Sequence, residues 1–294
     1  MGRVLIFSDS KRESLELGLY DIRALNKIHQ EYKKNKWGAL ALLIDSDTYG
    51  TLEVLQRLKN NYDALYFQDL VFQKSHHIRN SGINKFMINY EIDILPLSIC
   101  SRILNFKGSK QDGITILEPK TAGRSVYRML KLLGFKNVYL ASKGHRISVG
   151  TISNSMDEED SKTYKEETTE QINGVSLQEC VLESTILINF SAPLSIQLIE
   201  LMKEPRLVLS IPADEFTNSN FRMSDSCETD LFYPMLTQVA VKHNLKFLSM
   251  PQKLRLAFLF ADKPGLTYVC ANTAHRGQSR KNIRDAIESA LKVN

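Results

Sequence analysis

The stretch "GITILEPKTAGRSVYRMLKLLGFKNVYLASKG", residues 113–144, determines the architecture of the middle of the chain. A short, β-branched strand is expected at 114–117, an amphipathic helix at 122–135 and a second strand at 137–142. Four apolar residues share one side of this helix: Val126, Met129, Leu130 and Leu133. Gly134 stands at the helix end, as a C-cap does. A connection this tight predicts a right-handed βαβ unit with both strands parallel in one sheet.

The turn of this unit, "EPKT", has the position of a phosphate site but not its composition. It opens at the carboxyl edge of the sheet against a helix N-terminus, where free N–H groups bind anions. Dinucleotide sites use glycines here, whereas Glu118 adds a negative charge and Pro119 lacks an N–H. Four residues could still hold an anion through side chains: Lys120, Thr121, Arg124 and Lys143. The turn therefore predicts weak NADP binding or none, and solvated first-turn cations are the alternative.

Strands and helices alternate through the first third of the chain. Strands are expected where apolar or strand-like runs occur, at 3–7, 38–47, 62–72 and 84–94. Helices are expected where apolar residues recur at helical spacing, at 20–34, 48–60 and 95–106. Such alternation predicts an α/β fold with a largely parallel sheet and helices on both faces. We expect a substrate-binding-like α/β lobe over 1–105 and a Rossmann-like lobe over 106–235. The C-terminal helices of 236–294 are expected to pack back on the first lobe.

The bulk composition slightly favours an anionic small molecule as a ligand and is weak evidence for nucleic acid. The net charge is +5, and Lys and Arg are spread along the chain without an aromatic-plus-basic motif, which argues against nucleic acid as a partner. Four distant cysteines form no C-x-x-C pair, which favours reduced thiols in a cytoplasmic protein. No apolar run approaches a membrane span. The acidic run 155–171 contains no Gly and lacks the spacing of a hard-cation loop, so no metal site is expected.

The whole chain resembles the shikimate/quinate dehydrogenase family. Residues 116–144 align without gaps to that family's G-A-G-G-x-x-R/K segment, through to its N-R-T at the second strand end. Matching positions are Arg124, Val126, Leu130, Gly134 and Val138, while "EPKT" replaces G-A-G-G and "SKG" replaces N-R-T. In this alignment Lys143 replaces the arginine that faces the NADP 2′-phosphate.

Further landmarks of the family follow in order along the chain. "LIFSDS" resembles its S-x-S segment, "DLVFQKSHH" its lysine-ending strand and "TILINFSAPLS" its I-I-N-A-T strand. The resemblance implies substrate binding by Ser8, Ser10, Asn84 and Gln252. It implies cofactor contacts by Lys120, Thr121, Arg124, Lys143, Asn189 and Ser191.

Two functions follow from this resemblance. The first is an NADP-linked dehydrogenase acting on a small cyclic hydroxy acid, in which Lys74 and Asp93 face each other at two strand ends and transfer the hydroxyl proton. The second is a family relative that lost the cofactor and binds a shikimate-pathway metabolite, or a protein, as a regulator. The combined loss of the glycines, of N-R-T and of the family's D-x-x-Y supports the second.

Overall fold

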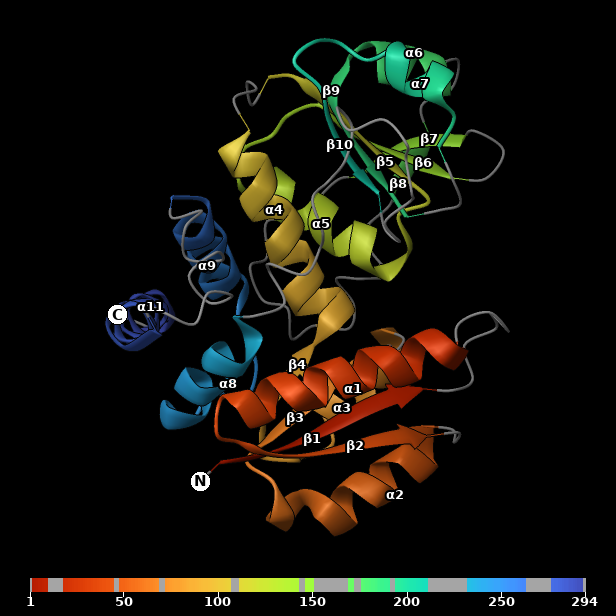
Figure 1. Ribbon diagram of the computed structural model, residues 1–294. Helices are drawn as coiled ribbons and strands as arrows, with labels where there is room; N and C mark the ends of the chain where they lie inside the picture. Colours follow the sequence, from red (N-terminus) through yellow and green to blue (C-terminus); the bar gives the residue numbers. More distant parts are fainter. Residues whose placement is uncertain are drawn as a thin grey trace. The chain divides into compact units, whose positions relative to one another are not determined.

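The computed structural model divides the chain into two compact units (Figure 1). The first unit comprises Met1–Leu95, Thr229–Leu259 and Lys263–Asn294, and the second comprises Pro96–Glu228 and Phe260–Asp262. The structure describes residues 2–9, 18–44, 48–68, 72–106, 111–142, 146–150, 169–171, 176–190, 194–210, 232–262 and 276–292.

The first unit contains a four-stranded parallel sheet of order β2-β1-β3-β4. Its strands are β1 (Arg3–Asp9), β2 (Gly38–Ile44), β3 (Ala64–Phe67) and β4 (Phe86–Asn89). Helices α1 (Gly18–Lys34), α2 (Thr48–Leu58) and α3 (Phe72–Arg79) connect them, with the short 3-10 turn η1 (Lys59–Asn61) before β3. The alternation expected from sequence is confirmed.

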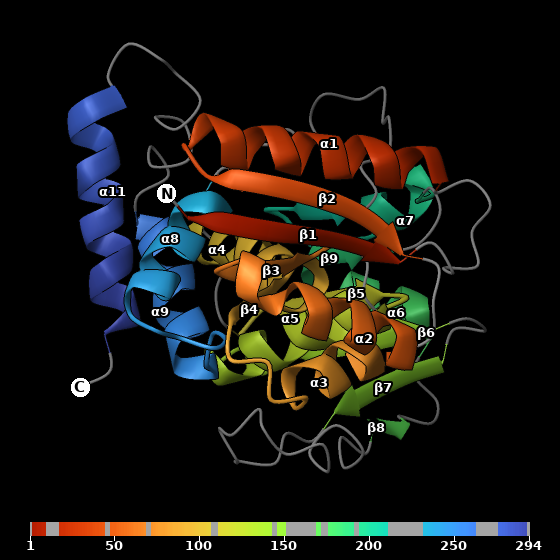
Figure 2. The same cartoon turned by 90° about the horizontal axis from the view of Figure 1, so that it is seen from below.

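Each face of this sheet has its own helical cover. In Figure 2, helix α1 lies on one side of the strands, and α2 and α3 lie on the other. Odd-numbered strand residues such as Phe7 and Phe67 pack with Leu55 of α2 and Ile78 of α3. On the other face Tyr66 meets the rings of Tyr32 and Tyr233. Pleating accounts for this division, since successive strand residues point to opposite faces.

Two segments of the first unit differ from the sequence prediction: the strand expected over 84–94 ends at Asn89, and the segment around Lys74 is a helix. The segment carrying Lys74, predicted to be a strand, forms α3, which begins at Phe72. Ser75 and Ile78, three residues apart, are both fully buried. The spacing of these two buried side chains is that of one face of a helix. Lys74 therefore lies in the first turn of a helix instead of at a strand end.

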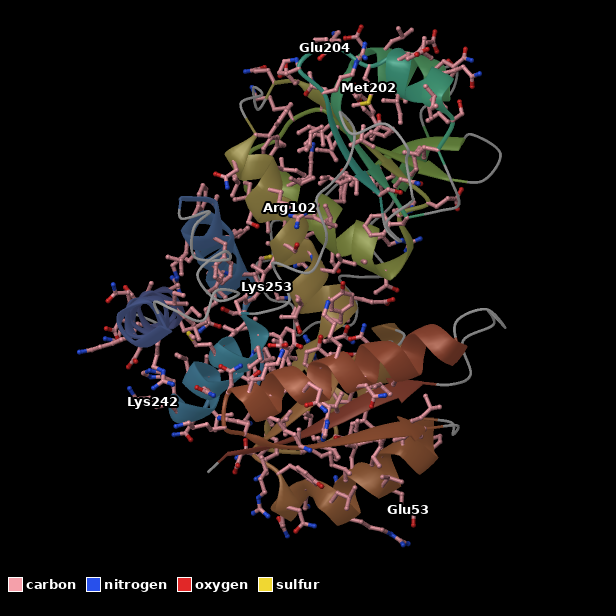
Figure 3. The ribbon with its side chains drawn as sticks, viewed as in Figure 1. Glu53, Arg102, Met202, Glu204, Lys242 and Lys253 are labelled. Carbon is pink, nitrogen blue, oxygen red and sulfur yellow. The ribbon has the colours of Figure 1, made fainter. Side chains whose placement is uncertain are left out.

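Three C-terminal helices belong to the first unit, as expected: α8 (Tyr233–Lys242), most of α9 (Met250–Asp262) and α11 (Arg276–Leu291). The apolar face of α11 is buried through Ile283, Ile287 and Leu291. Lys242 of α8, labelled in Figure 3, forms an ion pair with Glu288 of α11 at 2.8 Å. These helices contribute buried apolar side chains to the core of the first unit.

The second unit contains a six-stranded sheet of order β10-β9-β5-β6-β7-β8. The first four strands are parallel to one another, β7 is antiparallel to β6, and β8 is antiparallel to β7. The strands are β5 (Gly113–Leu117), β6 (Val138–Ser142), β7 (Arg146–Gly150), β8 (Thr169–Gln171), β9 (Ser184–Asn189) and β10 (Leu207–Ser210). The helices are α4 (Leu95–Asn105), α5 (Lys120–Leu132), α6 (Leu177–Leu182) and α7 (Ile196–Glu200). The βαβ unit β5-α5-β6 is confirmed.

Candidate functional site

Polar side chains gather where the strands of the first unit end. Ser8 lies near the end of β1, Gln68 directly follows β3, and Asn89 is the last residue of β4. All three are buried. Parallel strands bring their carboxyl ends to one edge of the sheet, which is the edge where open α/β folds bind their ligands.

Asn89 turns the chain at this edge and positions an acid. Its side-chain oxygen accepts hydrogen bonds from the N–H groups of Glu91 and Ile92, at 2.9 and 3.2 Å. This cap starts the π-helix η2 (Tyr90–Ile94), a rare element that occurs often at functional sites. Asp93 lies in η2, beyond the end of β4 and not in the strand itself, and its Oδ2 accepts the N–H of Asn89 at 2.8 Å.

Two cations from different helices converge on Asp93. Lys253 Nζ lies 2.8 Å from Asp93 Oδ1, and Arg79 Nη2 donates to Asp93 Oδ2 at 2.8 Å. Lys253, labelled in Figure 3, belongs to α9 and also donates to the carbonyl of Ile92 at 3.4 Å. The side chains of Asp93 and Lys253 are 0% and 1% exposed, so this is an ion pair removed from water. We call Arg79, Asp93 and Lys253 the Asp93 cluster.

The cluster keeps its carboxylate charged. Burial on its own would raise the pKa of Asp93, but the positive charges of Lys253 and Arg79 and the hydrogen bonds from Lys253 and Asn89 outweigh it. The net result is a pKa below the ordinary value of an aspartate. With two cations and one anion, the Asp93 cluster carries a net charge of +1, which favours a negatively charged ligand.

Apart from Asp93 Oδ1, which has the Lys253 ammonium 2.8 Å away, two buried polar atoms near this edge have no hydrogen-bond partner among the described residues. They are Oε1 of Gln68, an acceptor, and Nε of Arg79, a donor. The Arg79 guanidinium also lies 5.9 Å from the centre of the Phe247 ring, so an aromatic face holds it in place. A buried polar atom without a partner costs free energy, and a bound ligand that supplies the partner removes that cost.

The structure brings together only some of the residues predicted for the first unit. Ser8 and Asp93 both lie at the carboxyl edge, whereas Asn84 precedes β4 and lies at its opposite end. The strand therefore separates Asn84 from Asp93. Ser10 and the side chain of Lys74 lie outside the described residues, so the Lys74–Asp93 pair remains a prediction.

Gln252 lies in the first unit and serves the fold. Its Oε1 accepts hydrogen bonds from the N–H and the hydroxyl of Ser249, and its Nε2 donates to the carbonyl of Leu291 at 2.9 Å. Gln252 thus caps α9 and fastens the end of α11. The next residue, Lys253, is the one that points to Asp93.

Lys253 and Arg79 were not among the residues predicted from the sequence. Lys253 lies on the buried stripe of α9, together with Met250, Leu256 and Ala257. A lysine at an apolar position of an amphipathic helix was the available signal, because an unpaired charge is almost never buried. Arg79 had no comparable signal, since it ends a short helix whose spacing is not strongly amphipathic.

In the second unit the predicted cofactor turn has two backbone features that favour glycine. Glu118 has a φ of +46°, a left-handed conformation that favours glycine. Gly123 approaches its neighbours closely, because a Cβ there would lie 2.9 Å from both the Phe190 ring and Pro119. The turn lies between β5 and β9, next to Asn189, where the strand order reverses. That is the place where this class of sheet binds nucleotides.

This turn lacks the free backbone N–H donors that a phosphate site requires. The Glu118 N–H donates to the carbonyl of Ala141 at 2.8 Å, inside the sheet, and Pro119 has no N–H. Two backbone donors are therefore missing where the glycine-rich turn would cradle pyrophosphate, and the Glu118 carboxylate adds repulsion. The residues present do not fit a pyrophosphate held in the ordinary way.

The other predicted cofactor residues differ in burial, and some lie outside the described residues. Asn189 is buried, and its amide donates to the hydroxyl of Ser210 at 3.2 Å. Thr121 is half-buried and Arg124 is exposed on α5. Lys143, Ser191 and the side chain of Lys120 lie outside the described residues.

Other classes of site are not evident in the described part of the chain. It contains no cluster of three or more His, Cys, Asp or Glu side chains arranged for a metal ion. Of the acidic run 155–171, only 169–171 is described, as β8. None of the described helices is long and apolar enough to cross a membrane. Cys100 and Cys180 are free and buried, and burial raises the pKa of both thiols.

Several solved structures have a similar fold. No family model and no curated protein sequence matches the chain. The malic enzyme from Pyrococcus horikoshii matches with a TM-score of 0.72 at 15% identity, over 99% of this chain and 76% of that one. The NAD-dependent malic enzyme from Thermotoga maritima gives 0.69 at 14% identity, over 98% and 84%.

The family expected from sequence is a weaker match. Shikimate 5-dehydrogenase from Thermus thermophilus gives a TM-score of 0.46 at 12% identity, over the full length of both chains. The better matches are thus malic enzymes, and the relation to shikimate dehydrogenases is distant. At these identities the likeness shows the fold alone: the chain has the α/β Rossmann-like fold found in dehydrogenases.

Proposed function

We propose that this protein binds a small hydroxy acid at the carboxyl edge of the first sheet, and that it does so without a dinucleotide. The observation that carries the proposal is a pair of buried atoms without a hydrogen-bond partner among the described residues, Gln68 Oε1 and Arg79 Nε. Arg79 belongs to the positively charged Asp93 cluster, and Gln68 follows β3 at the same edge of the sheet, since Phe67 pairs with Asn89. A metabolite-binding regulator fits both these atoms and the altered turn of the second unit.

The chemistry of the two atoms defines the ligand. Arg79 Nε needs an acceptor, and a carboxylate supplies one with charge-assisted strength. Gln68 Oε1 needs a donor, which a hydroxyl group supplies. A small molecule that carries both groups satisfies both atoms, whereas a simple inorganic anion without a proton satisfies only the first.

Lys253 adds a fixed positive charge to the site. Its ammonium is held by Asp93 Oδ1 and the Ile92 carbonyl, so it needs no rearrangement to attract an acid. A charge in a buried setting is screened less by salt than one on the surface. If the protein is a metabolite-binding regulator, the positive charge of Lys253 increases its affinity for the carboxylate of the ligand.

A second candidate function is an NADP-linked dehydrogenase acting on a small cyclic hydroxy acid. The buried Lys253–Asp93 pair favours it, because such a pair suits transfer of the hydroxyl proton during oxidation. The fold shared with malic enzymes agrees with this class of reaction. In this candidate Arg124, Lys120 and Lys143 would hold the phosphates by side chains, and the nicotinamide would accept the hydride.

A thermal-shift experiment tests the proposal with shikimate, quinate and malate, each without NADP. A ligand at a hundred times its dissociation constant adds about 2.7 kcal/mol of stability, which is readily measured. We expect at least one of these acids to raise the melting temperature. No shift with any of them would contradict the proposal.

The variant Gln68→Met separates binding from folding. It keeps the volume of the side chain and removes the unpaired oxygen, so stability should be unchanged or higher. If Gln68 contacts the ligand, affinity should fall by about tenfold, the equivalent of one hydrogen bond to a charged or polar group. The matched control is Gln56→Met on α2, an exposed position whose amide donates to the Ser81 carbonyl. Equal affinity of the two variants for the hydroxy acid would show that Gln68 does not contact the ligand.

A further inference from the structure

A cavity lies in the first unit, at the opposite edge of the sheet from the Asp93 cluster. It has a volume of about 180 Å³. Asp63 precedes β3, and Asn84 and Lys85 precede β4, so these residues stand at the amino ends of the strands. Asn244 and Lys246, from the connection between α8 and α9, line the facing wall.

Backbone contacts fix the wall formed by the α8–α9 connection. Asn244 has a φ of +54°, and its N–H donates to the carbonyl of Val241, which turns the chain at the end of α8. The carbonyl of Lys246 then accepts the N–H of Met87 in β4 at 2.7 Å. The wall is thus hydrogen-bonded to the edge strand of the sheet.

The charges and amides of the cavity favour an anion. Lys85 and Lys246 contribute two positive charges, against the one negative charge of Asp63. Asp63 is already engaged, because its Oδ2 accepts the N–H of Arg3 at 2.8 Å. The amides of Asn84 and Asn244 add neutral donors. We propose that this cavity binds a small anion with two or more negative charges, held between Lys85 and Lys246.

This inference does not depend on the proposed function, since the Asp93 cluster and the cavity share no residue. It also gives Asn84 a different role from the one expected: an amide donor of the anion cavity instead of a contact to the hydroxy acid. Phosphates and polycarboxylates share the chemistry required here. A lysine ammonium binds either kind of anion, because it is a compact point charge. The titration must therefore distinguish phosphates from polycarboxylates.

Calorimetric titration of the full chain with inorganic pyrophosphate and, separately, with citrate tests the site. We expect one of the two to bind, and the tighter one identifies the ligand as a phosphate or a polycarboxylate. The double variant Lys85→Ala/Lys246→Ala should lose affinity by about tenfold or more. The matched control Lys33→Ala/Lys281→Ala removes the same charge from exposed positions of the first unit and should keep the wild-type affinity.

Two results would overturn the inference: no binding of either probe to the wild type, or an equal loss of affinity in both double variants. The second result would mean attraction by net charge alone. Lysine acetylation of the wild type gives a readout that needs no variant. The bound anion should protect Lys85 and Lys246 while Lys33 and Lys281 react as before, and equal reactivity at all four would also count against the site.

Discussion

The carboxyl edges of the two sheets occupy the same position in their units and differ in chemistry. In the first unit, this edge holds Asp93, on which Arg79 of α3 and Lys253 of α9 converge. In the second, the turn after β5 keeps a left-handed Glu118 and a closely packed Gly123, but its donors are engaged or missing. This fold can therefore keep the shape of a binding turn while losing its chemistry, and each edge must be judged by its own side chains.

The largest effect is expected at the edge of the first unit, in the Asp93 cluster. Asp93→Ala leaves Lys253 and Arg79 buried without their anion, and breaking such a network costs about 3–5 kcal/mol. Urea unfolding monitored by circular dichroism measures the change. Glu53→Ala is the control, since it breaks an exposed ion pair with Arg57 and should barely move the midpoint. Similar midpoints for the two variants would show that the cluster contributes little to stability.

A smaller loss is expected at the edge of the second unit. Gly123→Ala forces a Cβ against Phe190 and Pro119, and overpacking of this kind costs about 1–3 kcal/mol. In an unobstructed helix the same change would stabilise by roughly 0.5–1 kcal/mol, so the sign of the effect distinguishes the two cases. Thermal unfolding measures it. In a Phe190→Leu background the cost should decrease, and an unchanged cost would place the clash elsewhere.

The pH dependence of stability tests the charge on Asp93. Its pKa is lower in the folded state, so its contribution is complete above the ordinary aspartate pKa of about 4 and decreases as the pH falls through the folded value. Unfolding midpoints measured from about pH 6 to about pH 3 should therefore fall more steeply for the wild type than for Asp93→Asn. Parallel curves would mean that Asp93 titrates normally.

The smallest effect on stability is expected from changing the turn residues of the second unit. Glu118→Gly with Pro119→Ala removes a left-handed non-glycine residue but adds freedom to the unfolded chain, so the two effects nearly cancel within about 1 kcal/mol. Calorimetry should instead show a gain in NADP affinity if the missing glycines are the cause of weak binding. If the variant gains none, the second unit lacks more than its glycines, and the regulator is favoured over the dehydrogenase.

More of the fold than of the site could be predicted from the sequence. Strands and helices can be predicted from the pattern of apolar residues that are close together in the sequence. The βαβ unit was predicted in this way from residues 113–142. The pairing of Asp93 with Lys253 joins residues 160 positions apart (253 minus 93), which no local pattern reveals. Lys74 was misplaced for a related reason: its segment contains Leu70, Val71 and Phe72, which resemble a strand until Ser75 and Ile78 are known to be buried.

The decisive test of ligand binding without a dinucleotide is a calorimetric titration of the wild type in the absence and presence of saturating NADP. The titrant is the hydroxy acid that gives the largest thermal shift. Because the Asp93 cluster is proposed to bind this acid on its own, the two dissociation constants should agree within about twofold. Binding that requires NADP, or that is accompanied by reduction of the nicotinamide, would contradict the proposal and establish the dehydrogenase instead.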